Sequence, residues 1–506
     1  MSAAAELAVL LEAPGPIRGT VSVAHGELVS LAATMFDRGY RLALVSAVDS
    51  VSDIRVVYLF VSGPPDRRIE LVLRTGRDRP VVPSLASLSF SASRFEREMR
   101  DLFGVEPLGR RAPSRLVLHQ HWPEGWHPMR HDAPASVPMQ EDTASYPFVE
   151  VQGKGVYEIP VGPVHAGLIE PGHFRFSVVG ETILKMKARL WFVHKGIERL
   201  FERRDFESGI ELAEKISGDS AVGHSLALCR AIEEALGITV TARGEELRVV
   251  LLELERLYNH VADIGALCND VGFGLAQARA LTLRERLLRL NRRVSGHRLL
   301  RGGVRVGGTS VNAMPDEREL DDVGDLFDQL VALARGQGTV MDRFTGTGAL
   351  SLLAVEEIGV LGVAARASGS TYDARLAHPV GGSLAGFSPA IATEGDVLAR
   401  FNVRVEEVAT SLRLLHDYCS RPGSLDESAP TSGVTIDGSG SGIVEGWRGA
   451  IVHRVEVHDG ELTRVKVVDP SFLNWPALAV SLADTIVPDF PLVNKSFNLS
   501  YAGNDL

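Results

Sequence analysis

The chain has 506 residues, of which 45% are hydrophobic and 23% charged, and a formal net charge of −11 at pH 7. This length predicts two or more domains with large cores. The acidic balance argues against a nucleic-acid-binding protein, which needs a basic surface. The sequence shows neither a signal peptide nor an apolar run near the roughly 20 residues of a membrane-spanning helix. We therefore expect a cytoplasmic protein that meets a membrane only through partners.

The first 125 residues predict a small α+β domain. The expected elements are a helix at 25–38 and strands at 41–48, 54–61 and 68–74. Another helix is expected to begin near Ser93, because apolar residues recur at helical spacing from there. The charged residues expected on its solvent face are Glu96, Glu98, Arg100 and Asp101.

Residues 126–150 are rich in proline and predict an extended linker. The rest of the chain, 151–506, predicts a bundle of long helices with peripheral strands. The expected helices lie at 244–268, 281–303, 317–336 and 396–417. From residue 442 the pattern changes to alternating runs on both sides of Asp459-Gly460, which predicts a β-hairpin.

The three cysteines, Cys229, Cys268 and Cys419, lie far apart and form no CxxC pair. An iron–sulfur cluster takes four ligands, mostly thiolates, and a cysteine-rich zinc site uses close pairs. This chain can supply neither alone. We expect three free thiols in a reducing compartment.

Several strings of residues resemble known families. FEREMRDLFGV at 95–105 and HWPEGWHPMRHD at 121–132 resemble the small hydrophilic subunit of respiratory complex I. The later strings resemble the large subunit shared by complex I and the membrane-bound, hydrogen-evolving (group 4) [NiFe]-hydrogenases. These strings are GPVH at 162–165, VHKGIER at 193–199, ELERLYNHVADIG at 253–265, NDVGF at 269–273, RASGSTYDAR at 366–375 and NWPAL at 474–478. Both subunits are fused in one chain in formate hydrogenlyase and in some complex I relatives, so the resemblance implies the same fusion here.

In the hydrogenases that this chain resembles, thiolates from two CxxC pairs hold nickel and iron. The match places the first pair on Ser217 and Ser220, and the second on Ser500 and Gly503. Soft thiolates suit these metals, whereas hydroxyl groups do not and glycine has no side chain. The resemblance therefore implies a degenerate metal site and a chain that evolves no hydrogen.

Complex I, which lacks the same cysteines, binds a quinone headgroup in the corresponding cavity and protonates it from a histidine, an aspartate and a tyrosine. The resemblance implies a quinone or proton-relay site of His165 or His173 with Asp270, and the loop spacing leaves the choice of histidine open. Tyr501 is the candidate for the tyrosine. An imidazole beside a carboxylate can supply a proton near neutral pH. The alternative is that each histidine is structural and that Asp270 caps a turn.

Two further roles are left open. Asp219, His224 and Asp505 have a spacing that would permit a harder ion such as Mg²⁺, although solvated loop carboxylates are the plainer interpretation. The resemblance also implies that His194 and Arg366 face an iron–sulfur cluster in a partner subunit. The alternative for both is an ordinary surface or interface residue.

The resemblance as a whole predicts a redox subunit of a complex I-like or formate hydrogenlyase-like membrane assembly. Such a chain binds no cofactor itself, with the possible exception of quinone, and receives electrons from a small iron–sulfur subunit. Its other expected partners are hydrophilic-arm subunits and antiporter-like membrane-arm subunits, which hold it at the cytoplasmic face of the membrane. The electrons would serve quinone reduction or ion translocation. The alternative is a structural adaptor with an empty cavity in the same assembly.

Overall fold

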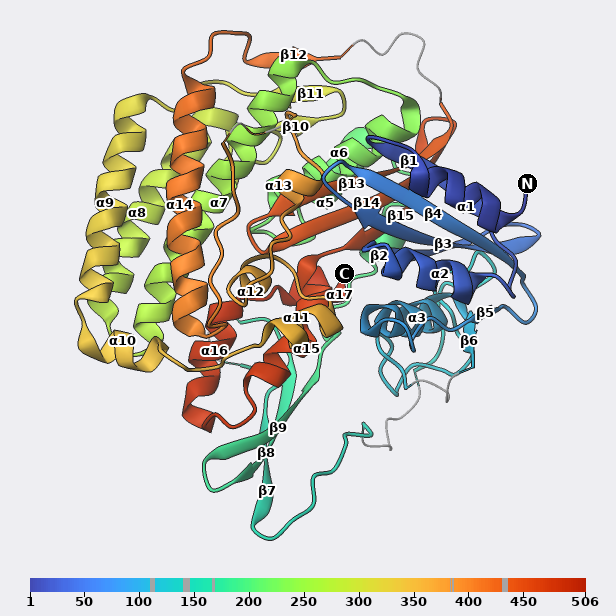
Figure 1. Cartoon of the computed structure of the whole chain (residues 1–506), viewed down its shortest axis with the longest axis horizontal. Coiled ribbons are helices and arrows are strands. Elements are labelled where there is room, and N and C mark those ends of the chain that lie inside the picture. Colours follow the sequence, from blue (N-terminus) through green and yellow to red (C-terminus); the bar gives the residue numbers. More distant parts are fainter. Residues whose placement is uncertain (110–113, 140–145, 166–168, 383, 385, 430–435) are drawn as a thin grey trace.

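A computed structural model describes residues 1–109, 114–139, 146–165, 169–382, 384, 386–429 and 436–506. A small domain with its own sheet lies on one side and a group of long helices on the other (Figure 1). A second sheet, formed by β13 (Gly438–Gly446), β14 (Gly449–His458) and β15 (Glu461–Val468), lies between them. The predicted fold class, an α+β domain followed by a helical domain with peripheral strands, is confirmed.

The N-terminal domain is built on a four-stranded sheet in the order β1-β4-β3-β2. Its β1–β4 pair is parallel and the other pairs are antiparallel. The three predicted strands are confirmed, and β1 is an additional strand that was not predicted. The elements are α1 (Ala3–Glu12), β1 (Ile17–Ser22), α2 (Leu28–Asp37), β2 (Arg41–Asp49), β3 (Asp53–Ser62), β4 (Arg67–Gly76), β5 (Val81–Pro83), α3 (Phe90–Phe103) and β6 (Glu106–Leu108).

Helix α3 is buried on more sides than its charged sequence predicts. Glu96, Glu98 and Asp101 are at most 7% exposed, so their expected solvent position is wrong. Each carboxylate has a polar partner: Glu96 accepts the N–H of Leu85, Glu98 lies 2.7 Å from Lys466 of the large domain, and Asp101 accepts the backbone N–H groups of Leu116 and Val117. A buried carboxylate is tolerated where such partners satisfy it, and the Glu98–Lys466 pair joins the two domains.

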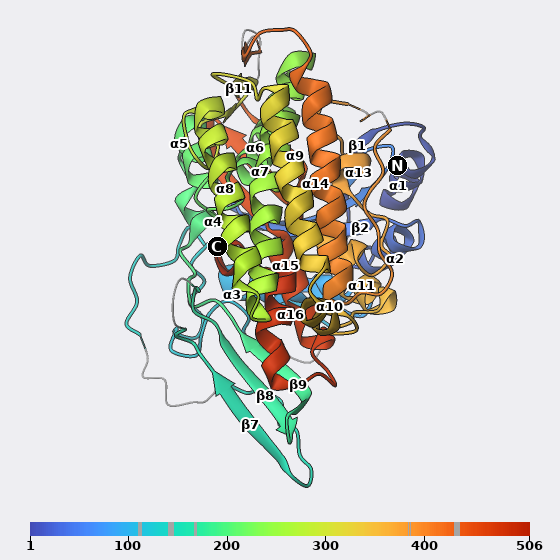
Figure 2. The ribbon, with the colours of Figure 1, turned by 90° about the vertical axis from the view of Figure 1, so that its left-hand side faces the viewer.

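The helical side contains four long helices that lie next to one another in Figure 2. They are α7 (Ala242–Asp270), α8 (Gly274–Ser295), α9 (Glu317–Arg335) and α14 (Val397–Cys419). All four were predicted, but the bounds expected for α8, 281–303, are wrong. The helix begins seven residues earlier, and it ends where Gly296 adopts a left-handed conformation with φ 86°. A left-handed glycine is a common helix stop, so Gly296 ends α8 and the later Gly302-Gly303 pair does not.

Helix α6 (Ala221–Leu236) packs directly on strand β13 because that strand alternates glycine on one face. A Cβ atom at these glycines would overlap backbone atoms of α6, so no other residue permits this close approach. The contacts pair Gly438 with Ala235, Gly440 with Ala231, and Gly442 with Ala227. Since α6 starts directly after Ser220, this packing fixes the position of the turn 217–220. The predicted hairpin at Asp459-Gly460, between β14 and β15, is confirmed.

A three-stranded sheet of β7 (Val156–Val161), β8 (His173–Val179) and β9 (Thr182–Arg189) extends from the body of the molecule (Figures 1 and 2). The described parts of the predicted linker 126–150 contain no helix or strand, and its residues 140–145 lie outside the described residues. The other elements are α4 (Ile197–Leu200), α5 (Phe206–Ala213), β10 (Val304–Arg305), β11 (Gly308–Ser310), α10 (Gly338–Phe344), α11 (Leu352–Ile358), α12 (Gly362–Arg366), α13 (Ala374–Ala377), β12 (Asp426–Ser428), α15 (Pro470–Ser481), η1 (Val487–Asp489), α16 (Phe490–Phe497) and α17 (Tyr501–Asp505).

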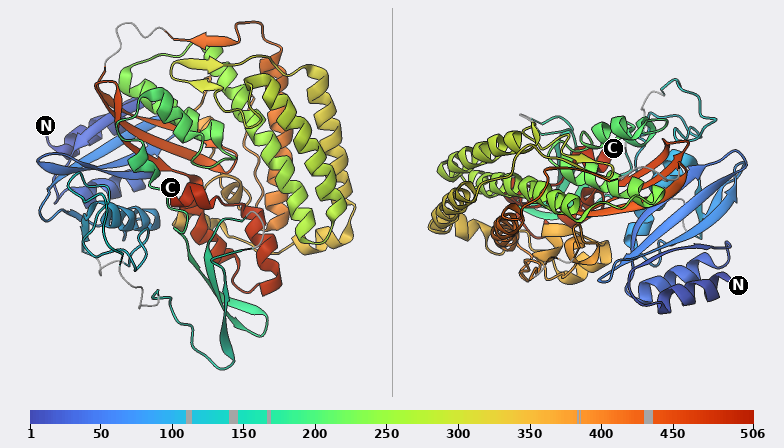
Figure 3. Two further views of the ribbon diagram at one scale, coloured as in Figure 1. Left: turned by 180° about the vertical axis from the view of Figure 1, so that it is seen from behind. Right: turned by 90° about the horizontal axis from the view of Figure 1, so that it is seen from above.

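The C-terminus lies in the middle of the molecule, between the N-terminal domain and the long helices (Figure 3). Short helices α16 and α17 bring the last residues of the chain back to this central position. None of the helices in the described part of the chain is long and apolar enough to cross a membrane.

Candidate functional site

The two segments at which the hydrogenase ligands were expected meet in the structure. The Oγ atoms of Ser217 and Ser500 lie 2.8 Å apart, although 283 residues separate them in the sequence. Ser217 belongs to the turn between α5 and α6, and Ser500 is the N-cap of α17, where it accepts the N–H of Gly503 at 2.9 Å. Both serines are less than a tenth exposed. Helix packing thus brings two buried hydroxyl groups into direct contact.

An ion pair lies beside the two serines. Both terminal nitrogens of Arg448 lie 2.7 Å from the carboxylate of Asp219, in a bidentate arrangement, and Asp219 also accepts the hydroxyl of Ser217 at 2.8 Å. Burial alone would raise the pKa of the Asp219 carboxyl, but Arg448 and Ser217 outweigh it and hold that pKa below its usual value. We call Ser217, Asp219, Arg448 and Ser500 the polar end of the site.

The turn that carries Asp219 is held by contacts on its other side. The Asp219 carbonyl accepts hydrogen bonds from Asn259 at 2.8 Å and Trp447 at 2.9 Å. On helix α7, the Glu255 carboxyl accepts two N–H groups at the start of α6, directly after the turn. Burial raises the pKa of Glu255 to about 8, although these two donors oppose the shift. The backbone at the polar end is therefore fixed independently of any ligand.

A cavity of about 830 Å³ opens from the polar end. It brings together most of the predicted site residues, because His165, Asp270, Tyr501, Ser217 and Ser500 all line it. Its walls are largely apolar, and they include Val161, Ile169, Phe174, Phe176, Val487 and Phe490. An apolar cavity with a few convergent polar groups is typical of a small-molecule site.

The structure distinguishes the two candidate histidines. His165 lines the cavity, and its Nε2 donates to the carbonyl of Gly172 at 2.9 Å, which leaves Nδ1 to take or give a proton. His173 is not among the described lining residues. Its Nδ1 lies 3.2 Å from the carbonyl of Gly162, and its Nε2 accepts a hydrogen bond from Arg175 at 3.1 Å. Both nitrogens of His173 are therefore in use, and the geometry favours His165.

Asp270 and Tyr501 lie at different depths of the cavity. Asp270 is exposed at the end of α7, and partial burial raises the pKa of its carboxyl to about 6, with Lys495 opposing the shift. Tyr501 is 8% exposed and packs against Trp475, with ring centroids 4.9 Å apart. Burial raises its pKa to about 12. Among the described residues no hydrogen bond or ion pair joins Asp270 to His165, so the expected direct pair is not formed.

The remaining positions of the expected metal site do not resemble a ligand set. A Cβ atom at Gly503 would lie 2.6 Å from the carboxylate of Asp469, so there is no space for a side chain there. Cys229, Cys268 and Cys419 are free, and none of the three is among the described residues that line the cavity. Three buried serine hydroxyl groups and one glycine thus occupy the four positions on which the resemblance placed the thiolates of a [NiFe] centre.

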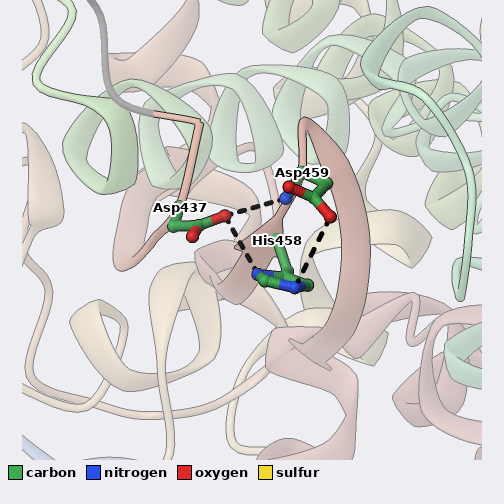
Figure 4. A group of neighbouring side chains, drawn as sticks. All are labelled: Asp437, His458 and Asp459. Atoms are coloured by element: carbon green, nitrogen blue, oxygen red, sulfur yellow. Dashed lines mark hydrogen bonds and ion pairs between the residues drawn. The ribbon is translucent and has the colours of Figure 1, made fainter.

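The suggested Mg²⁺ ligands are not brought together. Asp219 pairs with Arg448, Asp505 binds the N–H of Val193, and His224 lies between Asp469 and His453 in the core. Within the described ranges, the group with metal-binding spacing is instead formed by His458 and Asp459 at the β14–β15 turn and by Asp437, the residue before β13 (Figure 4). All three of these side chains are exposed, and His458 is hydrogen-bonded to Asp437 at 3.0 Å. Such surface groups are common without an ion.

The expected partner-facing position of Arg366 is wrong. Its side chain is fully buried, and its guanidinium contacts Glu407 at 2.5 Å, Glu445 at 2.7 Å and Asp373 at 3.3 Å. Three carboxylates require a cation between them, which explains why this arginine lies inside. His194 is half-buried, with Nδ1 donating to the carbonyl of Asp505 at 2.6 Å, and burial lowers its pKa. Its role towards a partner remains a prediction.

Arg448 is the residue of the polar end that the sequence did not single out. It follows the buried Trp447 at the turn between β13 and β14, and its guanidinium lies 3.8 Å from the centre of that ring. The role of Arg448 follows from the fold, which brings the β13–β14 turn against the turn 217–220. The GWRG string carries no spacing that reveals it.

Known proteins match this chain along most of its length. Residues 21–138 match the 30 Kd subunit of respiratory-chain NADH dehydrogenase, and residues 270–428 match its 49 Kd subunit. Formate hydrogenlyase subunit 5 of Escherichia coli (strain K12) is 30% identical over 477 residues, which cover 89% of this chain and 81% of the relative. Hydrogenase-4 component G of the same organism is 32% identical over 436 residues, which cover 81% and 73%.

These matches define a class of proteins in which 30 Kd-like and 49 Kd-like sequences are fused. This chain belongs to the family of formate hydrogenlyase subunit 5 and hydrogenase-4 component G, the fused large subunits of the group 4 hydrogenase type. An NADH-quinone oxidoreductase subunit of Phocaeicola vulgatus is also similar, at 27% identity over 403 residues that cover 74% of this chain and 77% of the relative. The family resemblance inferred from the sequence is confirmed.

A solved structure agrees on the fold. A chain of the membrane-bound sulfane sulfur reductase, an archaeal respiratory membrane complex, superposes with a TM-score of 0.63. The superposition covers 70% of this chain and 99% of that chain at 24% identity.

Proposed function

We propose that this chain is the large hydrophilic-arm subunit of a membrane-associated, complex I-like redox complex that does not use nickel–iron chemistry. The observation that carries this proposal is the cavity of about 830 Å³, with apolar walls and with Ser217 and Ser500 in contact at its polar end. Because the hydroxyl groups and Gly503 do not fit a [NiFe] centre, no step is assigned to one. The membership of the family supports the placement in a membrane complex.

In this proposal the cavity receives the headgroup of a quinone. A quinone headgroup is a flat, largely apolar ring with two carbonyl oxygens, so it matches apolar walls and a polar end. Its reduction takes two electrons, which would come from an iron–sulfur cluster of a small partner subunit, and two protons. Asp270, whose pKa is raised to about 6, and Nδ1 of His165 are the groups placed to supply these protons. The same electron transfer could instead drive ion translocation by membrane-arm partners.

The subunit would sit at the cytoplasmic face of the membrane and would be held there by its partners. Candidate partner-facing groups are His194 and the neighbouring Lys195, which is exposed. The small iron–sulfur subunit, other hydrophilic-arm subunits and antiporter-like subunits are the expected neighbours.

A second function, a non-catalytic adaptor, is favoured by one specific observation. The polar groups at the end of the cavity already satisfy one another, since Ser500, Ser217, Asp219 and Arg448 form one connected set. A set that is complete without a ligand keeps its shape when the cavity is empty. The adaptor would transmit that shape between redox subunits.

Two measurements test the proposal. Elemental analysis of the purified chain is expected to find no stoichiometric nickel, and one nickel per chain would contradict the proposal. Donor-driven quinone reduction in membranes should fall when a bulky residue fills the cavity, for example in Val161→Trp, after correction for the amount of assembled complex. The matched control is Val179→Trp, on the same sheet but 41% exposed and not among the described lining residues. Unchanged flux in the cavity variant would favour the adaptor.

A further inference from the structure

The hydrogen atoms at the polar end can be assigned from the contacts. The Asp219 carboxylate, ionised beside Arg448, has no hydrogen to give, so Ser217 must donate to it across the 2.8 Å contact. A serine hydroxyl carries a single hydrogen. Ser217 therefore cannot also donate to Ser500, and the 2.8 Å contact between the two hydroxyl groups must be a donation from Ser500 to Ser217. The direction of both hydrogen bonds is thus fixed.

Most hydrogen-bond donors of Arg448 are also already in use. Four of its N–H bonds are directed at neighbours: two at the carboxylate of Asp219, one at Ser220 and one at the carbonyl of Asn498. The side chain is 6% exposed, whereas the side chain of Asp219 is 37% exposed. Because the fifth N–H bond belongs to this largely buried side chain, what this end mainly offers to a ligand is the carboxylate edge and the unused lone pairs of two hydroxyl oxygens. These groups accept hydrogen bonds.

The directions of the Ser217–Asp219 and Ser500–Ser217 hydrogen bonds cannot easily reverse. Turning Ser217 towards a ligand would break its bond to Asp219, and the Asp219 carbonyl is itself held by Asn259 and Trp447. Ser500 accepts the N–H of Gly503 as the N-cap of α17, so its oxygen is also fixed in place. An unsatisfied buried polar group costs about 1–3 kcal/mol, which opposes any rearrangement that leaves one of these atoms without a partner.

We propose that the polar end is a hydrogen-bond acceptor site that binds the hydroxyl-bearing, reduced form of the cavity's ligand in preference to the carbonyl-bearing, oxidised form. This inference rests on the proposed function and specifies it, since it names the redox form that the site selects. The two forms of a quinone differ by two electrons and two protons, which convert both carbonyl oxygens into hydroxyl groups. A quinol hydroxyl can donate to Ser217, Ser500 or Asp219, whereas a quinone carbonyl meets oxygen lone pairs there.

The preference has a consequence for electron transfer. A site that binds quinol more tightly than quinone raises the reduction potential of the bound pair, because binding stabilises the product of the reduction. The polar end would therefore favour flow of electrons into the cavity. In this division of labour the polar end orients the headgroup, and the protons come from His165 and Asp270 nearer the exposed part of the site.

The test is titration calorimetry of the full-length chain, under anaerobic conditions, with ubiquinone-1 and separately with its quinol. One hydrogen bond contributes about 0.5–1.5 kcal/mol, so the quinol is expected to bind roughly 3- to 10-fold more tightly than the quinone. Ser217→Ala removes one acceptor and frees the hydrogen of Ser500, so it should weaken quinol binding by about the same factor and leave quinone binding unchanged or tighter. Ser500→Ala is an independent second variant, whose folding is checked because the residue caps α17.

Ser225→Ala is the matched control. Ser225 is a buried serine of α6 whose hydroxyl donates to the carbonyl of Val222, and it is not among the described lining residues. It should leave the affinity for both forms unchanged. Equal binding of both forms by the unaltered chain, or tighter binding of quinone, would overturn the acceptor-site inference and leave the quinone cavity standing. Binding of neither form would overturn the proposed quinone function together with this inference.

Discussion

Two of the arginine-centred clusters that carry buried charge in this protein differ in one respect. We call Arg366 with Glu407, Glu445 and Asp373 the Arg366 network. Its side chains are all at most 1% exposed, and Arg375 also contacts Asp373 and Glu407, so the carboxylates meet their cations inside the protein. The polar end is also built on an arginine and a carboxylate, but Asp219 is 37% exposed towards the cavity.

The difference separates a structural role from a ligand-binding role. A charge cluster that is closed on all sides can only hold elements together, and the Arg366 network joins α12, the loop before α13, α14 and β13. A cluster in which one carboxylate is exposed to a cavity can also bind a small molecule. The family resemblance suggested the opposite for Arg366, because it placed that residue on a partner-facing surface. Burial, which the short motif does not encode, decides the matter.

The largest expected effect is on the closed cluster. Arg366→Met keeps most of the side-chain volume but leaves three buried carboxylates near one another, and breaking a buried pair in this way costs about 3–5 kcal/mol. Urea unfolding should show this loss as a lower midpoint. Arg421→Met is the control, because Arg421 is 41% exposed and its ion pairs lie on the surface, where they contribute less than about 1 kcal/mol. Similar losses in both variants would refute the distinction.

The second effect concerns the space at Gly503, one of the expected ligand positions. Gly503→Cys places a Cβ atom 2.6 Å from Asp469, which is itself held by His224 and caps α15. Overpacking of a core costs about 1–3 kcal/mol, so a lower unfolding midpoint is expected in calorimetry or urea. Gly274→Ala, at the start of α8 with no atom within 4 Å of the added Cβ, should have no such cost. A fully stable Gly503→Cys variant would show that this position can accommodate a thiol side chain.

A third, smaller effect is expected at the open cluster. Arg448→Met removes the partner of Asp219 and should lower the free energy of unfolding by about 1–2 kcal/mol at pH 7, since the partly exposed carboxylate remains screened by water. The pKa of Asp219 is depressed in the folded protein from its usual 3.8. The stability it contributes is therefore present above that value and is lost as pH falls through the folded pKa.

The difference between Arg448→Met and the unaltered chain should accordingly shrink as pH falls from about 5 towards 3. Urea unfolding across this range measures it. A difference that stays constant with pH would mean that Arg448 stabilises the protein through its packing on Trp447 and not through Asp219.

The sequence predicts those features of this molecule that depend on residues near one another in the chain, and it misses those that depend on distant residues. Periodicity predicted the four long helices, and the Asp459-Gly460 pair predicted its hairpin, because both are local signals. The end of α8 was placed wrongly because three glycines, Gly296, Gly302 and Gly303, could each stop a helix, and only the packing selects the first. The burial of Glu98 on α3 was missed because its partner Lys466 lies 368 residues away in the sequence.

The site was predicted in part for the same reason. The family resemblance placed His165, Asp270, Ser217, Ser500 and Tyr501 in one neighbourhood, and all five line the cavity. Their mutual contacts depend on where the turn between β13 and β14 reaches the turn 217–220, and no local pattern records that. Arg448 was therefore missed. The choice between His165 and His173 likewise needed the carbonyl groups of Gly172 and Gly162, which are backbone atoms with no sequence signature.

The smallest expected effect on stability, and the sharpest test of the open cavity, is Asp270→Asn. The pKa of Asp270 is raised to about 6 in the folded protein from its usual 3.8. Its contribution to stability is therefore fully present below about 4 and is lost as pH rises through about 6. Asparagine does not titrate, so the free energy of unfolding of the variant should rise slightly relative to the unaltered chain between pH 5 and 8. The rise should be less than about 1 kcal/mol because Asp270 is exposed.

The same variant separates the two proposed functions. If Asp270 supplies a proton to a quinone, loss of its carboxyl should lower donor-driven flux per assembled complex, most strongly at and below about pH 6, where this carboxyl still carries a proton. Flux is measured in membranes from about pH 5 to 8, a range that brackets the pKa of Asp270. Asp437→Asn, an exposed carboxylate that is not among the described lining residues, is the control. Unchanged flux in Asp270→Asn across this range would end the proton-relay role and leave the adaptor, because a subunit that only maintains shape has no step that this carboxyl could slow.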